Sequence, residues 1–173
     1  MVLPILKITG EERKKLAVLR QVSVDVTEFN DDLRELVASI IETLFAAGGV
    51  GLAAPQIGRN LNLFGMRTLE GIENDTREVR VVINPQTVTE IGEDLGTPDE
   101  KIESCLSIPG VLGRVTRCHE VGCVYWDEQG KRHGESLKGM EARIYQHERD
   151  HLNGVLFVDK ADKFYRPDSA TNV

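Results

Sequence analysis

The chain has 173 residues, of which 40% are hydrophobic and 28% are charged, and these proportions are typical of one globular domain covering residues 1–173. A net charge of -7 without a cluster of lysine and arginine argues against a nucleic-acid-binding surface. No apolar run is long enough to cross a membrane or to act as a signal peptide, so we expect a soluble cytoplasmic protein without a membrane partner.

The first half of the chain is expected to contain one helix and two strands. Residues 1–29 have no regular pattern, whereas Asn30, two acids and apolar residues at helical spacing predict a helix that ends at Gly48-Gly49. The small residues of 49–58 predict either a tight connection or a backbone that a strand-like substrate can approach. Strands are expected at 62–66 and at 79–83, the second ended by Asn84-Pro85.

The second half is expected to be a hairpin followed by a long helix. In order, we expect an acidic loop at 92–101, strands at 115–126 and 131–135 with a turn between them, a helix at 136–153 ended by Gly154, and a short strand at 155–158. The fold class is therefore α+β, with mixed, mostly antiparallel sheets packed around a buried C-terminal helix and a second helix near the N-terminus.

The last helix carries the pattern His147-Glu148-x-x-His151. Residues four apart lie on one face of a helix, so both imidazoles can bind the same metal ion. The glutamate lies about 100° around the helix from His147, where a general base for a water molecule belongs. Two inward histidines in an amphipathic helix are the structural alternative, and Cys105 by itself is better explained as a small buried hydrophobic residue.

Three stretches together resemble the signature motifs of peptide deformylases. They are Gly49-Val-Gly-Leu-Ala-Ala-Pro-Gln56, Glu103-Ser-Cys-Leu-Ser107 and Gln146-His-Glu-Arg-Asp-His151, in this order, and the likeness extends through most of the chain. The resemblance implies an enzyme that removes the formyl group from the N-terminal formylmethionine of new polypeptides. It also implies that Cys105 joins His147 and His151 as a metal ligand, which reverses the first interpretation of this cysteine.

The resemblance further implies the roles of the other motif residues. Three protein ligands leave one position open for water, as in catalytic rather than structural metal sites. Glu148 would move the proton of that water to the departing amine. The amide of Gln56 and the backbone N–H of Leu106 would stabilise the oxyanion. Ferrous iron is implied as the physiological ion, with Zn²⁺, Ni²⁺ or Co²⁺ able to replace it.

The substrate is expected to lie as an extended strand on a backbone surface. That surface would be Gly49, Val50 and Gly51, with Met140 and Ile144 as candidate walls of a methionine pocket, although core packing explains these two equally well. The implied partners are nascent N-formylmethionyl polypeptides and, transiently, the ribosome. Docking through the long C-terminal helix of many bacterial members is not expected, because the chain stops soon after Asp159.

Ser104 departs from the family pattern, which usually has glycine there. If that position needs positive φ, serine adds strain of about 1 kcal/mol or more. We also expect Glu103 to pair with Arg117. Three alternatives remain open: another HExxH metallopeptidase, a deformylase-like binding protein without activity, and a structural zinc site with a fourth protein ligand.

Overall fold

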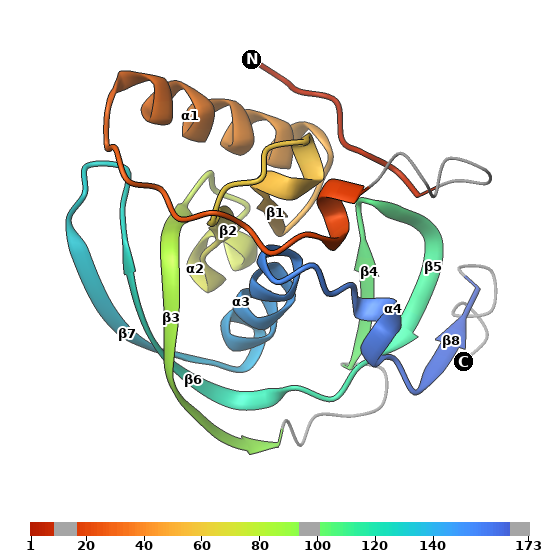
Figure 1. The fold of residues 1–173 in the computed structure, drawn as a ribbon. Helices are drawn as coiled ribbons and strands as arrows, with labels where there is room; N and C mark the ends of the chain where they lie inside the picture. Colours follow the sequence, from red (N-terminus) through yellow and green to blue (C-terminus); the bar gives the residue numbers. More distant parts are fainter. Residues whose placement is uncertain (9–16, 94–100, 167–173) are drawn as a thin grey trace.

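The structure, a computed structural model, describes residues 1–8, 17–93 and 101–166 (Figure 1). In chain order its elements are η2 (Ala17–Arg20), α1 (Asp31–Ala46), β1 (Gly51–Ala53), η3 (Ala54–Ile57), β2 (Leu63–Arg67), α2 (Leu69–Glu73), β3 (Val79–Glu93), β4 (Ile102–Cys105), β5 (Ile108–Arg114), β6 (Cys118–Trp126), β7 (Arg132–Lys138), α3 (Gly139–Leu152), α4 (Phe157–Lys160) and β8 (Lys163–Tyr165).

The strands form two antiparallel sheets. The larger has the order β1-β2-β3-β6-β7, and the smaller has the order β4-β5-β8. Helix α3 lies between them, at the centre of Figure 1, so side chains of this helix can meet residues from both sheets. The predicted α+β class, with a buried C-terminal helix and a second helix near the N-terminus, is confirmed.

Helix α1 forms where its capping pattern predicts. The side chain of Asn30 accepts a hydrogen bond from the N–H of Leu33 at 3.0 Å, and two acids follow in the first turn. Its apolar face, which includes Ile40 and Leu44, packs against Leu52 of β1 and Leu63 of β2. This packing holds β1 in place at the edge of the larger sheet.

Helix α3 is buried on several sides. Its residues Ala142, Ile144 and Tyr145 belong to the core cluster that includes Phe64 and Met66 of the larger sheet. Gly154, just beyond the helix, has φ 71°, and a Cβ atom there would lie 2.6 Å from the carbonyl oxygen of Arg20. Only glycine satisfies both conditions, so this turn fixes the end of α3 against η2.

Strand β3 is longer than the sequence pattern predicts. It continues through Asn84-Pro85 to Glu93, so residues 92 and 93 of the expected acidic loop belong to the strand, whereas 94–100 lie outside the described residues. Asn84 has φ 50°, and its amide exchanges two 2.8 Å hydrogen bonds with the backbone of Val26. The register against β6 shifts at this point, so the strand passes the proline at a bulge instead of ending there.

Other parts of the prediction differ as well, and β6 begins at Cys118 instead of residue 115. Strand β7 runs to Lys138 and α3 begins only at Gly139, so Leu137 belongs to the strand. The expected strand at 155–158 is wrong, because α4 forms there and Asp159 accepts a 2.8 Å hydrogen bond from the N–H of Leu156. Helix α2, the short element η2 and all three strands of the smaller sheet, β4, β5 and β8, were not predicted.

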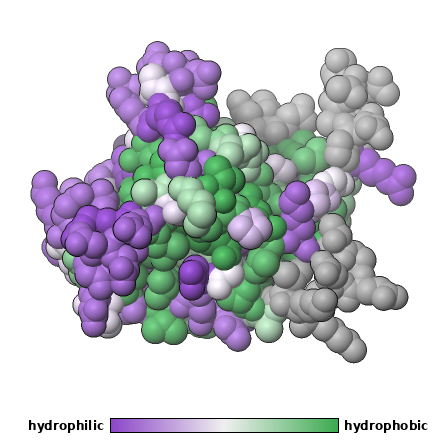
Figure 2. Space-filling view, turned by 90° about the horizontal axis from the view of Figure 1, so that it is seen from above, coloured by the Kyte–Doolittle hydropathy of each residue, from purple (hydrophilic) through white to green (hydrophobic). Residues whose placement is uncertain are grey.

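The molecular surface seen from above Figure 1 carries a broad apolar area beside strongly hydrophilic groups (Figure 2). None of the described helices is both long and apolar enough to span a membrane.

Candidate metal centre and active site

Two elements bring three metal-ligating side chains together. Cys105 is the last residue of β4, and His147 and His151 lie one turn apart on α3. Their ligand atoms all lie within 4.8 Å of one another, and Cys105 Sγ is 3.3 Å from His151 Nε2. Ligands on one tetrahedral ion lie roughly 3.5 Å apart, so these residues fit a single small metal ion.

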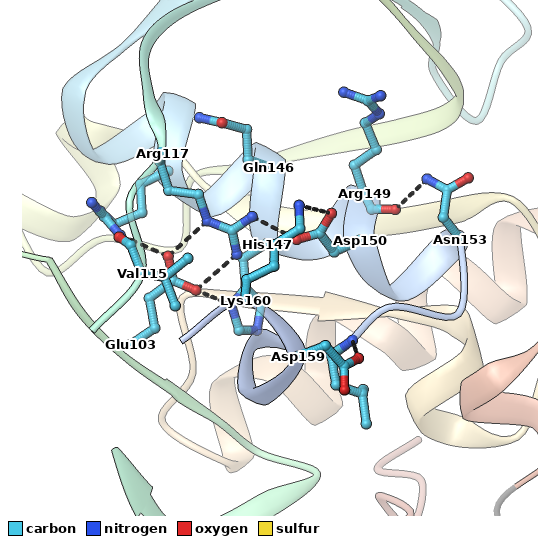
Figure 3. A network of polar contacts seen from close by, with 12 residues as sticks. Glu103, Val115, Arg117, Gln146, His147, Arg149, Asp150, Asn153, Asp159 and Lys160 are labelled. Atoms are coloured by element: carbon cyan, nitrogen blue, oxygen red, sulfur yellow. Dashed lines mark hydrogen bonds and ion pairs between the residues drawn. The ribbon is translucent and has the colours of Figure 1, made fainter. Parts of the chain in front are cut away.

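Glu103, two residues before the cysteine, orients one of the histidines (Figure 3). Its Oε2 accepts a hydrogen bond from His147 Nδ1 at 2.8 Å, which directs Nε2 of the ring away from the carboxylate. The predicted ion pair with Arg117 is confirmed by two hydrogen bonds of 2.9 Å, and Arg143 donates a third at 2.7 Å. A carboxylate bonded to a ligand histidine in this way fixes the ring and its tautomer.

The charge of Glu103 is well compensated. Burial opposes ionisation, but hydrogen bonds from Arg117 and His147 outweigh it and hold the pKa of Glu103 well below its ordinary value. Arg117 also binds Asp150 at 2.5 Å, and Asp150 binds Lys160 of α4 at 2.7 Å, as Figure 3 shows. This chain of alternating charges connects β4, α3 and α4 behind the metal ligands.

Glu148 lines the cavity as a carboxyl group whose pKa is raised, in contrast to Glu103. It is only 3% exposed, and burial raises its pKa to about 7. Its Oε2 atom is buried and has no hydrogen-bond partner within the structure. A buried, unpaired carboxylate oxygen is uncommon in folded proteins, and it is explained if the oxygen serves a water or substrate atom.

The backbone of β1 makes room for this glutamate. A Cβ atom on Gly51 would lie 2.3 Å from Glu148 Oε1, so no other residue fits here without displacing the carboxylate. The sequence analysis assigned Gly51 to substrate contact, and the structure adds this steric reason for the glycine.

Gln56 and Leu106 both lie next to Cys105, Gln56 in space and Leu106 in the chain. The Gln56 side chain is 1% exposed; its Oε1 accepts a hydrogen bond from the Ala53 N–H at 2.8 Å, and its Nε2 lies 3.5 Å from Cys105 Sγ. Because its oxygen is fixed in this way, the amide nitrogen points toward the metal ligands. Leu106 occupies the turn between β4 and β5, next to the Cys105–Ile108 pair of the ladder.

A cavity of about 660 Å³ opens onto this cluster. The five residues that sequence analysis placed at the substrate all line it: Gly49, Val50, Gly51, Met140 and Ile144. Ile144 is 4% exposed and forms part of the inner wall, whereas Met140 is 49% exposed at the mouth. The N-terminal residues Ile5 and Lys7 also line the cavity, and no sequence signal indicated this.

Ser104 carries no backbone strain. Among the described residues other than glycine, only Asp75 and Asn84 have positive φ, so the expected cost of a left-handed serine does not arise. The residue is exposed and lines the cavity.

The other two cysteines lie outside the metal cluster. Cys123 is 2% exposed within the core, and burial raises its pKa to about 11. The described residues add no fourth protein ligand to the group of three, so the structural zinc alternative lacks support.

A comparison with protein-family models matches the polypeptide deformylase family over residues 3–166. The chain belongs to this family. It is 39% identical over 164 residues to a peptide deformylase of Treponema pallidum, covering 95% of this chain and 91% of the relative. A peptide deformylase of Prochlorococcus marinus is 41% identical over 143 residues, covering 83% of this chain and 68% of the relative.

Solved structures agree with this membership. The crystal structure of peptide deformylase from Thermotoga maritima superposes with a TM-score of 0.80 at 32% identity, covering 94% of this chain and 99% of that one. A peptide deformylase from Synechococcus elongatus, solved in complex with actinonin, superposes with a TM-score of 0.78 at 37% identity, covering 93% of this chain and 79% of that one. Both family and fold therefore support a deformylase function.

Proposed function

We propose that this protein is a metal-dependent hydrolase that removes the N-formyl group from formylmethionyl polypeptides and releases formate. The observation that carries the proposal is the meeting of three groups around one cavity: the Cys105, His147 and His151 cluster, the buried Glu148 carboxylate, and the Gln56 amide. The family match over residues 3–166 supports treating the chain as one catalytic unit.

The three ligands would hold one divalent ion. When bound, the ion would act as a Lewis acid that polarises the formyl carbonyl and makes a water molecule more acidic. Thiolate and imidazole donors suit zinc as well as iron. We propose ferrous iron as the physiological ion, with Zn²⁺, Ni²⁺ or Co²⁺ in its place after purification.

Glu148 would move the proton. Its unpaired Oε2 would accept a proton from the attacking water, while a new C–O bond forms at the formyl carbon. When the C–N bond breaks, the same carboxyl would deliver that proton to the departing amine. A pKa near neutrality suits a group that must both take and return a proton.

Gln56 and Leu106 would stabilise the negative charge on the formyl oxygen. The Gln56 amide is oriented by its bond to the Ala53 N–H, so it needs no reorganisation during the reaction. The N–H of Leu106, the residue after Cys105, would be the second donor.

The methionine side chain would enter the cavity beside Ile144, and the polypeptide would leave past Val50 and Met140 at the mouth. Backbone hydrogen bonds to residues 49–51 would hold the extended substrate without reading its sequence. Newly made formylated polypeptides would thus be the partners.

The test is formate release from formyl-Met-Ala-Ser by protein loaded with iron or nickel in the absence of oxygen. We expect release by the wild type and its loss in both Cys105→Ala and Glu148→Ala. Cys123→Ala, which changes a buried cysteine outside the cluster, is the matched control and should retain activity. No release from folded, metal-loaded wild type would refute the proposal, and formate release that survives Cys105→Ala would refute the role of Cys105 as a required metal ligand. Cleavage of the Met-Ala bond without formate release would favour a different metallopeptidase.

A further inference from the structure

The N-terminal segment is hydrogen-bonded to both segments that carry the proposed oxyanion donors, η3 and the turn between β4 and β5. The N–H of Leu6 donates to the carbonyl of Gln56 at 2.8 Å, and the N–H of Ile8 donates to the carbonyl of Ser107 at 2.7 Å. Lys7 lies between these two bonds. The backbone of Lys7 is therefore held in a fixed position beside Gln56 and Ser107, although Ser107 lies about 100 residues later in the sequence.

Lys7 lines the cavity. Ile5 and Lys7, two residues apart, both line it, as expected when alternate side chains of an extended segment share a face. Ile5 is half-buried whereas Lys7 is exposed, so the ammonium group lies at the rim and the apolar residue lies further in. The segment is drawn in red in Figure 1, running past α1 toward β4 and β5.

Among the described residues that line this cavity, Lys7 is also the one exposed charged side chain. The others are Glu103, Arg143, His147 and Glu148, which are buried or nearly so. Glu103 is already bonded to both Arg143 and His147. Lys7 forms no ion pair with any described carboxylate. A cation at the mouth of a site that is held by its backbone and has no partner among the described residues is available for a ligand.

We propose that Lys7 determines specificity, favouring an acidic side chain in one of the two residues that follow the formylmethionine. This inference rests on the proposed deformylase function. With the formyl group between Gln56 and Glu148, the next residues must leave through the mouth, where the long flexible stem of a lysine gives its charge wide reach. The net charge of -7 would by itself repel acidic peptides, so the preference must come from this local contact.

The experiment measures kcat/KM of the nickel-loaded protein on two peptide series, formyl-Met-X-Ala-amide and formyl-Met-Ala-X-amide, with X as Asp, Asn or Lys. Asp and Asn have the same shape and differ in charge, and the amide removes the C-terminal carboxylate that would otherwise attract Lys7. We expect Asp to exceed Asn by about two- to fivefold in one series at low salt, the range of exposed ion pairs. The ratio should fall toward one at high salt.

Variants at Lys7 assign the effect. Lys7→Met should bring the Asp/Asn ratio to about one, Lys7→Glu should invert it, and Lys7→Arg should preserve it. Lys131→Glu is the matched control, because it makes the same change in net charge on an exposed residue before β7 that does not line the cavity.

The two proposals fail in different ways. If wild type turns over neither Asn nor Lys peptides, the deformylase function itself is wrong. If Asn peptides are turned over but the Asp/Asn ratio is the same in wild type and Lys7→Glu, or changes equally in Lys131→Glu, the role of Lys7 is refuted.

Discussion

Replacing Gly51 with alanine should displace the proposed general base, Glu148, without changing that residue itself. The added Cβ would lie 2.3 Å from Glu148 Oε1 and 2.7 Å from its carboxyl carbon, whereas ordinary contacts begin at 3.4 Å. The carboxylate must therefore move by about 1 Å, because the Cβ belongs to β1, which is held between α1 and β2. Misplacement by this distance typically costs about 100-fold in rate.

The assay is formate release by the cobalt- or nickel-loaded variant, with kcat and KM determined separately. We expect kcat to fall about 100-fold, while metal content and the visible spectrum of the cobalt protein stay as in the wild type, since no ligand is touched. Thermal unfolding would establish that the variant is folded.

Gly65→Ala is the matched control on the neighbouring strand β2. Gly65 pairs with Leu52 of β1, and its added Cβ would meet only side-chain atoms at 3.6 Å, an ordinary contact distance. Wild-type kcat in folded Gly51→Ala would refute the reasoning, because the base would then tolerate displacement. Loss of metal together with activity would also contradict it, since the effect would act through the ligands.

Three further predictions concern the residues around the metal. Gln56→Leu should lower kcat by about 100- to 1000-fold with metal content unchanged, and an unchanged rate would exclude an oxyanion role. Glu103→Gln should weaken metal affinity by about 10- to 100-fold in competition with a chelator, because His147 loses its carboxylate; wild-type affinity would show that this contact is not needed. Cys123, whose pKa burial raises to about 11, should resist iodoacetamide in the folded protein at pH 8, where few of its thiols are ionised. Mass spectrometry after brief labelling would measure how much Cys123 is alkylated, with the unfolded protein as the positive control. Rapid alkylation of Cys123 in the folded protein would contradict its buried position.

Short-range features of the site could be predicted from the sequence. The i, i+4 spacing of His147 and His151 fixes both rings on one helical face wherever that helix lies, and Asn30 with its following acids begins α1 as expected. Such features depend on contacts within a turn or two, which the local sequence contains. The resemblance of three ordered motifs then gave the family, which the comparisons confirm.

Boundaries were less predictable where distant contacts override local signals. The proline after Asn84 predicts the end of a strand, but the Asn84 side chain binds the backbone of Val26, 58 residues away, and carries β3 through a bulge. Residues 155–158 have the composition of a strand, yet they precede and enter a short helix whose first turn is capped by Asp159. The Val26 partner cannot be recognised before the chain has folded, whereas the Asp159 cap lies only three residues from Leu156 and was overlooked.

The sequence by itself determined that a helix would present two imidazoles and a carboxylate at ligand and base positions. The spacing in the sequence did not show that Cys105, 46 residues before His151, would complete the cluster. It also did not show that residue 51 must be glycine because the Glu148 carboxylate occupies the space that a Cβ atom would need. It gave no sign that Lys7 would border the cavity. These relations were decided by the tertiary structure, since they arise only when β1, β4 and the N-terminal segment pack around α3, and side chains far apart in the chain then share one small volume.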